Sequence, residues 1–120
     1  MTGCIFCRIV AGEIPAALVH ADDRVIAFRD VNPQAPVHVL VVPRRHVASL
    51  AELAAGDGGE DAALGAALLA AASAVARAEG LAAPGRGYRV VANTGPQGGQ
   101  SVEHLHLHVL GGRDLAWPPG

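Results

Sequence analysis

The chain has 120 residues and a formal net charge of −2 at pH 7. A chain of this length fits a single domain, residues 1–120, which buries enough surface to form a core without disulfides. The slightly acidic balance, with Arg44-Arg45 as the one adjacent basic pair, argues against polymeric nucleic acid as a partner.

Two segments bear on localisation. The start, "MTG", lacks the basic segment followed by a long apolar one that marks a signal peptide. The alanine-rich run 62–76 is too short and too weakly apolar for a membrane-spanning helix. We therefore expect a cytoplasmic protein without membrane contact, in which Cys4 and Cys7 are thiols or metal ligands rather than a disulfide.

The first part of the chain is predicted to form a short helix and a hairpin. The stretch "CIFCRIVAGEIP" predicts a helix that ends near Gly12 and Pro15, with Cys4 and Cys7 on one helical face. The stretches "LVH" and "RVIAFRD" predict the two strands of a hairpin with an acidic turn. Two prolines in "VNPQAP" then predict a loop.

The middle of the chain is predicted to form a strand and two helices. The stretch "VHVLVVP" predicts a strand buried on both faces, with His38 and Leu40 on the same side. Ser49 with Glu52 is a capping-box pattern that predicts a short helix. Residues 60–79 predict the main helix, closed by a glycine and packed through an apolar stripe.

Two further strands are predicted in the last third of the chain. They are "YRVVAN" and "SVEHLHLHVLG", joined by the turn-rich "TGPQGG". About five strands in hairpin-like order, with one long helix and one or two short ones, predict an α+β fold with an antiparallel sheet. The apolar tail "RDLAWPPG" ends in prolines and extends neither a helix nor a central strand.

Three of the six histidines occupy alternate positions in "HLHLH". Alternate side chains of an extended strand share a face, so we expect His104, His106 and His108 to line one side and the leucines between them the other. Imidazole titrates near neutral pH and serves as nucleophile, acid, base or metal ligand. Three in register indicate a functional site rather than three structural histidines.

A glycine-rich loop precedes the histidines and contains Gly98, Gly99 and Ser101. Glycines let backbone N–H groups approach an anion closely, and a serine hydroxyl adds a donor. Asn93, at the end of the preceding strand, can add a side-chain amide. A glycine loop alone is usually only a turn, but beside three histidines it predicts a phosphate site.

The segments "GGQSVEHLHLHVLGG", "PQAPVHVLVVPRRH" and "WPPG" resemble the histidine-triad (HIT) superfamily, specifically its Hint branch. The resemblance covers nearly the whole chain. It implies a sheet continued across a homodimer, with the Trp117 tail near the partner's site, and binding of purine nucleoside monophosphates. It also implies cleavage of the P–N bond of nucleoside 5′-phosphoramidates (AMP-amine or AMP-lysine type), with acyl-adenylates as a further possible substrate class, through a covalent nucleotidyl-histidine. That chemistry requires no catalytic metal.

The resemblance implies roles for individual residues. His106 is the nucleophile, and His108 and Ser101 act on the phosphate and leaving group. His38 supports the triad. The implied nucleotide-binding residues are Asp30, Asn93, Gly99, Gln100, Ser101, His106 and His108, with Phe6, Ile9, Phe28, Val31 and Leu40 as walls around the base. Asp30 would accept hydrogen bonds from the ribose hydroxyls, but it also fits a turn cap before "NP".

The cysteine pair is a weak signal by itself, because C-x-x-C has several uses. A zinc site needs about four nitrogen or sulfur ligands in tetrahedral geometry. Some HIT members and the related uridylyltransferases carry such a pair with two histidines. By this resemblance we expect structural zinc at Cys4, Cys7, His46 and His104. The alternative is two free thiols and two hydrogen-bonded histidines.

Glu103 departs from the resemblance, because Hint members often carry an aromatic residue at this position. It alternates with the histidines, so we expect its side chain to face away from them. We therefore expect Glu103 to affect substrate preference rather than the chemistry.

Three other functions remain open. A dinucleoside polyphosphate hydrolase of the same superfamily is disfavoured by the ending "LGGRDLAWPPG". A nucleotide-binding regulatory module would bind AMP tightly with little turnover. A zinc hydrolase would use all three triad histidines as ligands and be sensitive to chelators.

Overall fold

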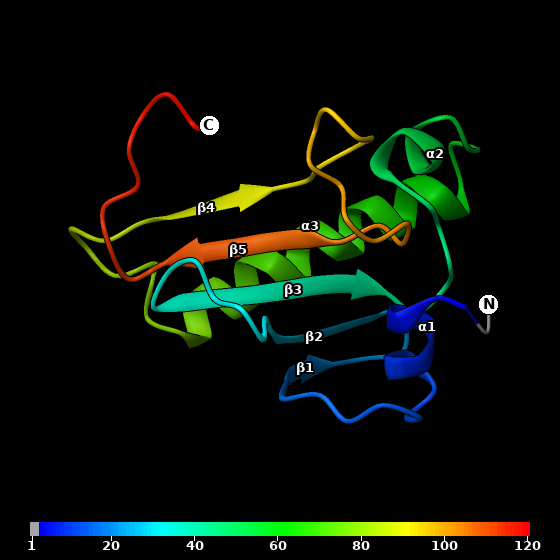
Figure 1. The fold of residues 1–120 in the computed structure, drawn as a ribbon, viewed down its shortest axis with the longest axis horizontal. Coiled ribbons are helices and arrows are strands. Elements are labelled where there is room, and N and C mark those ends of the chain that lie inside the picture. The colour runs from blue at the N-terminus through cyan, green and yellow to red at the C-terminus, as the bar shows by residue number, and fades with distance from the viewer. Residues whose placement is uncertain (1–2) are drawn as a thin grey trace.

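Five strands form one antiparallel sheet in the order β1-β2-β3-β5-β4 (Figure 1). The computed structural model describes residues 3–120; Met1 and Thr2, part of the start examined for a signal peptide, lie outside the described residues. In chain order the elements are α1 (Ile5–Val10), β1 (Leu18–Ala21), β2 (Val25–Arg29), β3 (Val37–Pro43), α2 (Leu50–Ala54), α3 (Glu60–Ala78), β4 (Tyr88–Val91) and β5 (Leu107–Gly111). The predicted α+β class, with one long and two short helices, is confirmed.

β3 is buried on both faces, as predicted. Val39 and Val41 pack against the α3 side together with Val109 of β5. Leu40 faces the other way and packs with aromatic residues of α1 and β2. Since side chains alternate along a strand, His38 shares the side of Leu40. The sheet therefore has one face that forms the main core and one face that is available for a site.

α3 lies across the core face of the sheet (Figure 1). Its stripe of Leu64, Leu68 and Val75 is buried against the strands, as predicted. Gly80 follows the helix at a φ of 79°, the left-handed conformation that commonly ends a helix. Within residues 3–120, α3 is the one helix that is long and apolar enough, by length and composition alone, to cross a membrane; it extends beyond the run 62–76 considered from the sequence. Its buried stripe is what a core helix shows.

The final strand is shorter than predicted. β5 begins at Leu107, so His104 and His106 precede the strand instead of belonging to it. The backbone N–H of Leu105 donates to the carbonyl oxygen of Val47 at 2.7 Å, which takes this part of the chain away from the sheet ladder. The alternation of side chains persists nevertheless: Leu105 and Leu107 lie in the core, and the two histidines contact α1 on the opposite side.

Candidate functional site

A cavity of about 650 Å³ lies on the sheet face opposite α3. Its lining residues are Ile5, Phe6, Ile9, Ile14, Pro15, Ala16, Ala17, Phe28, Arg29, Asp30, Val31, Leu40, Ser101, Val102, His106 and His108. The wall is mostly apolar, with a few polar groups gathered where two histidines, a serine and an aspartate meet. A concave apolar site with a few convergent polar groups is the usual form of a small-molecule site.

Most of the residues proposed for the nucleotide site line this cavity, including the five apolar residues expected around the base. Three do not: Asn93, Gly99 and Gln100 lie outside its lining. The sequence reasoning missed residues 14–17, which follow α1 and form part of the wall. Their signal was the apolar stretch "IPAA", but it lacks the periodicity that identifies a buried face.

A backbone carbonyl orients His106. Its Nδ1 lies 2.7 Å from the carbonyl oxygen of His104, and a carbonyl oxygen can only accept. The neutral ring of His106 therefore carries its proton on Nδ1 and keeps a lone pair on Nε2. The ring is buried but lines the cavity. The hydrogen bond holds His106 in the tautomer that a nucleophilic imidazole requires.

His38 and His108 are fixed by a second chain of hydrogen bonds. The backbone N–H of Gln34 donates to Nδ1 of His38 at 3.0 Å, so the neutral ring of His38 carries its proton on Nε2. This Nε2 lies 2.9 Å from Nδ1 of His108, which therefore accepts. His108 is left with an Nε2–H group, which can donate a hydrogen bond to a ligand in the cavity.

Burial keeps these two histidines neutral. Burial, together with the neighbouring rings of His106 and His38, lowers the pKa of His108 to about 4. Burial also lowers the pKa of His38, against the opposing effect of the Asp30 carboxylate. Near pH 7, His108 is therefore a neutral N–H donor rather than a cation.

Asp30 lies at the end of β2, where its two oxygens have different partners. Oδ1 accepts from the backbone N–H of Asn32 at 2.8 Å, so the turn cap considered from the sequence is present. Oδ2 lies 3.4 Å from Nε2 of His38. An ionised carboxylate has about four acceptor sites, so Asp30, which lines the cavity, keeps capacity to accept from a ligand.

The side chain of Gln100 holds the glycine-rich loop together. Its Oε1 accepts from the backbone N–H of Gly95 at 3.1 Å, and its Nε2 donates to the carbonyl oxygens of Ala48 and Val102 at 2.7 and 3.0 Å. The amide is therefore occupied in positioning the loop that ends at Ser101. The structure places Gln100 as a support of the loop and Ser101 at the cavity.

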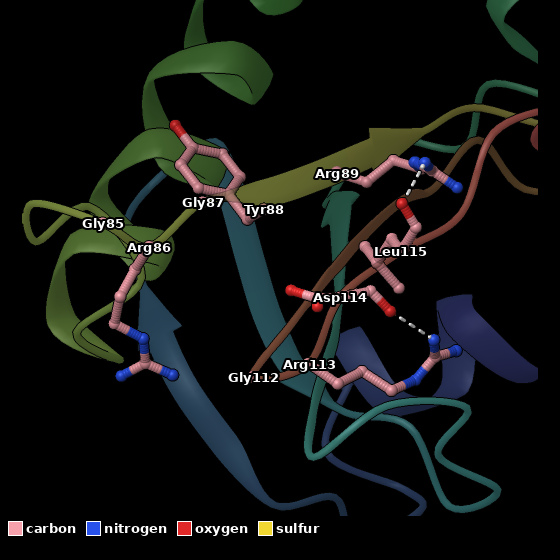
Figure 2. A pocket seen from close by; sticks show the side chains of 9 residues that line it. All are labelled: Gly85, Arg86, Gly87, Tyr88, Arg89, Gly112, Arg113, Asp114 and Leu115. Atoms are coloured by element: carbon pink, nitrogen blue, oxygen red, sulfur yellow. Dashed lines mark hydrogen bonds between the residues drawn. The ribbon is translucent and has the colours of Figure 1, made fainter.

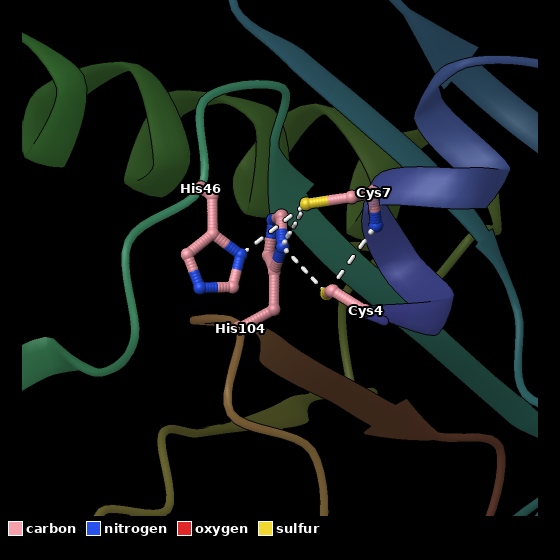
Figure 3. A group of neighbouring side chains, drawn as sticks. All are labelled: Cys4, Cys7, His46 and His104. Atoms are coloured by element: carbon pink, nitrogen blue, oxygen red, sulfur yellow. Dashed lines mark hydrogen bonds between the residues drawn. The ribbon is translucent and has the colours of Figure 1, made fainter. Parts of the chain in front are cut away.

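The other polar centre is formed by the side chains of Cys4, Cys7, His46 and His104, as Figure 3 shows. Sγ of Cys7 lies 3.2 Å from Nδ1 of His46 and 3.5 Å from Nδ1 of His104. Sγ of Cys4 lies 3.3 Å from Nδ1 of His104. The four predicted ligands, from α1, the segment after β3 and the segment before β5, thus converge on one point.

These distances fit a tetrahedral zinc ion. Bonds of about 2.3 Å to sulfur and about 2.0 Å to nitrogen would place those atoms roughly 3.5 Å apart. Nε2 of His104 lies 2.8 Å from the carbonyl oxygen of Pro43, so it carries the proton and leaves Nδ1 free to bind a metal. The two cysteines do not form a disulfide. Burial raises the pKa of the Cys7 thiol, with Cys4 raising it further, and a bound cation would offset that cost.

The groups that could hold a metal ion do not include His106. Within residues 3–120, two groups place their ligand atoms within 4.8 Å of one another: the cysteine–histidine group above, and Asp30 with His38 and His108. His104 belongs to the first group and His108 to the second. The geometry therefore argues against one metal held by all three triad histidines.

Phe6 connects the cysteine–histidine group to the cavity. Its ring contacts His104 and His106 edge-on, with centroid distances of 5.9 and 5.1 Å, and contacts Phe28 at 5.5 Å. Cys4 caps the N-terminus of α1, with its Sγ accepting from the backbone N–H of Cys7 at 3.4 Å. The same short helix therefore presents two possible metal ligands and part of the cavity wall.

Figure 2 shows a different cavity, of about 520 Å³, between the start of β4 and the segment after β5. None of the predicted site residues lines it. Arg89 donates to the carbonyl oxygens of Leu115 and Ala116 at 3.2 and 2.9 Å, and Arg113 donates to that of Gln34 at 3.0 Å. These arginines tie the C-terminal segment to β4 and to the loop before β3.

The sheet fold and the histidine cluster beside an apolar cavity define a protein of the histidine-triad class. The model of the HIT domain matches residues 11–115. The chain belongs to the HIT domain family.

Similar proteins span nearly the whole chain. A HIT-like protein of Synechococcus elongatus is 55% identical over 116 residues, covering 97% of this chain and 96% of that protein. A protein of Zea mays named 14 kDa zinc-binding protein is 49% identical over 116 residues, covering 97% of this chain and 87% of that protein. The second name is consistent with a metal-binding group of cysteines and histidines.

Solved structures agree with the fold. A HIT family hydrolase from Legionella pneumophila has a TM-score of 0.89 at 47% identity, covering 98% of this chain and 100% of that chain. A histidine triad protein from Clostridium difficile has a TM-score of 0.87 at 40% identity, covering 97% and 96%. The likeness to a HIT family hydrolase supports hydrolysis as the general class of activity.

The neutral buried histidines predict a pH-dependent stability. Because the folded-state pKa of His108 lies near 4 and an unfolded histidine titrates near 6.5, the unfolded chain binds more protons between those values. The melting temperature should therefore fall as the pH is lowered from about 6.5 to about 4. His108→Gln should make this fall shallower in thermal denaturation. An equally steep fall in the parent and the variant would contradict the prediction.

Proposed function

We propose that the protein hydrolyses purine nucleoside 5′-phosphoramidates through a covalent intermediate on Nε2 of His106. The observation that carries the proposal is the hydrogen bond from Nδ1 of His106 to the carbonyl of His104, which keeps Nε2 unprotonated beside the cavity. The family membership and the hydrolase named among the solved relatives support the same class of reaction.

The first chemical step transfers the nucleotidyl group to the enzyme. Nε2 of His106 attacks phosphorus, so an Nε2–P bond forms as the P–N bond to the amine breaks. The departing nitrogen must gain a proton to leave as an amine, and the exposed hydroxyl of Ser101 can relay one from water. Positive charge on the imidazole is stabilised by the carbonyl of His104, which accepts from Nδ1–H.

The second step returns His106 to its neutral form. Water attacks phosphorus, the Nε2–P bond breaks, and the proton lost by water passes to solvent. Charge on the phosphoryl oxygens grows in both transition states, and the Nε2–H of neutral His108 can donate to one of them. His38 holds His108 in that tautomer and acts as a positioning residue.

The apolar wall and Asp30 are suited to the nucleoside. Phe6 and Phe28 contact each other edge-on on the cavity side of the sheet and provide aromatic surface for a base. Asp30 has acceptor capacity left for ribose hydroxyls after capping its turn. This arrangement favours a nucleoside monophosphate group over a bare phosphate.

We propose that the cysteine–histidine group holds a structural zinc ion. Cys4, Cys7, His46 and His104 would supply a complete tetrahedral set, with no position left open for a substrate. The proposed chemistry needs no metal, since His106 is the nucleophile. A metal here would add stability by joining α1 to the segments that flank the sheet.

We further propose a homodimer in which the sheet continues through β4. β4 is an edge strand, and its Tyr88 and Val90 are 40% and 39% exposed. An exposed edge with apolar side chains is a surface on which another strand can pair. Trp117 is 81% exposed on the C-terminal segment that Arg89 ties to β4, so the tail would lie close to the partner.

His106→Ala should abolish turnover and the covalent adduct, while AMP still binds. His108→Ala should leave a slowly forming adduct, with a loss of about 2–4 kcal/mol in transition-state stabilisation, the usual effect of removing one such donor. Mass spectrometry of rapidly quenched reactions with adenosine phosphoramidate tests both variants, and a diadenosine polyphosphate gives the rate of the competing activity. An adduct on His106→Ala would overturn the assignment. Tight AMP binding without turnover in the parent would favour a binding module.

The parent protein should contain one zinc ion per chain, and Cys7→Ser should lose it. Because the ion joins distant segments, we expect the melting temperature to fall by roughly 3–6 °C for each kcal/mol of binding energy lost. Elemental analysis and thermal denaturation test this, with His20→Ala as the control histidine outside both metal-ligating groups. Zinc retained by Cys7→Ser at full occupancy would contradict the proposed ligand set.

Val90→Glu should convert the dimer to a monomer, because it places a charge on the β4 edge where the strands would pair. Leu18→Glu is the matched control: Leu18 is 56% exposed on β1, the opposite edge of the sheet. Light scattering at assay concentrations measures the mass. A monomeric parent protein, or a change in mass with Leu18→Glu alone, would count against pairing through β4.

A further inference from the structure

A second cavity adjoins the proposed nucleotide site. It has a volume of about 400 Å³, and its lining residues are Gly3, Cys4, Ile5, His46, Ser101, Val102 and Glu103. Ile5, Ser101 and Val102 line the nucleotide cavity as well. The two cavities therefore meet at Ser101, the residue proposed to relay a proton to the leaving nitrogen.

The position of Ser101 relates the second cavity to the chemistry. His106 lines the nucleotide cavity but not the second one, whereas Ser101 lines both. In a displacement at phosphorus, the leaving group departs on the side opposite the nucleophile. A group that leaves away from Nε2 of His106 and takes a proton through Ser101 would therefore enter the second cavity.

The charge of this cavity comes from Glu103. Glu103 is the one acidic residue that lines this cavity, and no arginine lines it. The side chain of Glu103 is exposed. No hydrogen bond or ion pair occupies its carboxylate within residues 3–120, whereas the acids Glu60, Asp61 and Glu79 each pair with an arginine. Its carboxylate is thus available to a cationic group in the cavity.

We propose that the second cavity receives the leaving amine and that Glu103 makes the enzyme prefer amines bearing a further positive charge. The inference rests on the proposed phosphoramidate hydrolysis. It adds to that proposal both a subsite for the leaving group and the chemical class that the subsite selects. The P–N bond breaks as described above; Glu103 takes no part in proton transfer and acts on the far end of the amine.

Three adenosine 5′-phosphoramidates of matched length test the proposal. The amines are 1,5-diaminopentane, pentylamine and 5-aminopentanoate, whose free ends are cationic, neutral and anionic. Since the charge pair is exposed, we expect kcat/KM for the cationic amide to exceed that for the neutral one by about twofold to fivefold at low salt. The preference should shrink as added salt screens the charges.

Variants identify the residue responsible. Glu103→Gln should bring the cationic-to-neutral ratio of kcat/KM to about one, and Glu103→Arg should make the anionic amide preferred. Asp23→Asn removes one exposed negative charge in the β1–β2 turn, away from both cavities, and should keep the parent ratio. Circular dichroism confirms that each variant is folded.

The outcomes separate this inference from the proposed function. Hydrolysis of all three amides with equal kcat/KM in the parent and Glu103→Gln would overturn the role of Glu103 and leave phosphoramidate hydrolysis intact. Hydrolysis of none by the parent would overturn the proposed function. In that case equilibrium Kd values for the three amides decide the subsite: a preference for the cation that Glu103→Gln removes supports it, and equal Kd values overturn it.

Discussion

The buried hydrogen bond from Nδ1 of His106 to the carbonyl oxygen of His104, 2.7 Å long, connects the two polar centres of the protein. Its acceptor belongs to a residue whose ring faces both cysteines, and its donor belongs to the ring that lines the cavity of about 650 Å³. The position of the carbonyl depends on the ring of His104, which the carbonyl oxygen of Pro43 also holds. The tautomer of His106 therefore depends on how firmly the cysteine–histidine group fixes one residue.

The hydrogen-bonding roles of the buried histidines depend on the protein keeping their rings neutral. Burial lowers the pKa of His38, His104 and His108, which costs stability in acid but leaves each ring with one donor and one acceptor. Backbone groups of Gln34 and Pro43 fix the tautomers of His38 and His104, and the ring of His38 in turn fixes that of His108. A cationic ring could only donate, and the chain from His38 to His108 would break.

Local patterns predicted the fold, and the family resemblance predicted most of the residues that line the cavity, whereas long-range contacts decided the rest. Alternation in "HLHLH" predicted which side each residue faces, because that period persists where the chain leaves the ladder. It could not predict that β5 starts at Leu107, since the N–H of Leu105 bonds to Val47, far away in sequence. The position of Gln100 could not be predicted for the same reason: its side-chain amide donates to the carbonyl oxygen of Ala48, which is distant in sequence. Residues 14–17 have no periodicity and reach the cavity only because α1 packs on the sheet.

The placement of α1 explains why a six-residue helix matters to a domain with a large core. A helix this short has little stability of its own, so tertiary contacts must hold it. Those contacts are the cysteines at its start and Phe6, which touches both His104 and His106. Any displacement of α1 would therefore open the wall of the cavity and loosen the ring beside it at the same time. In the proposed mechanism, affinity for a nucleoside and orientation of the nucleophile would for this reason be linked through one short element.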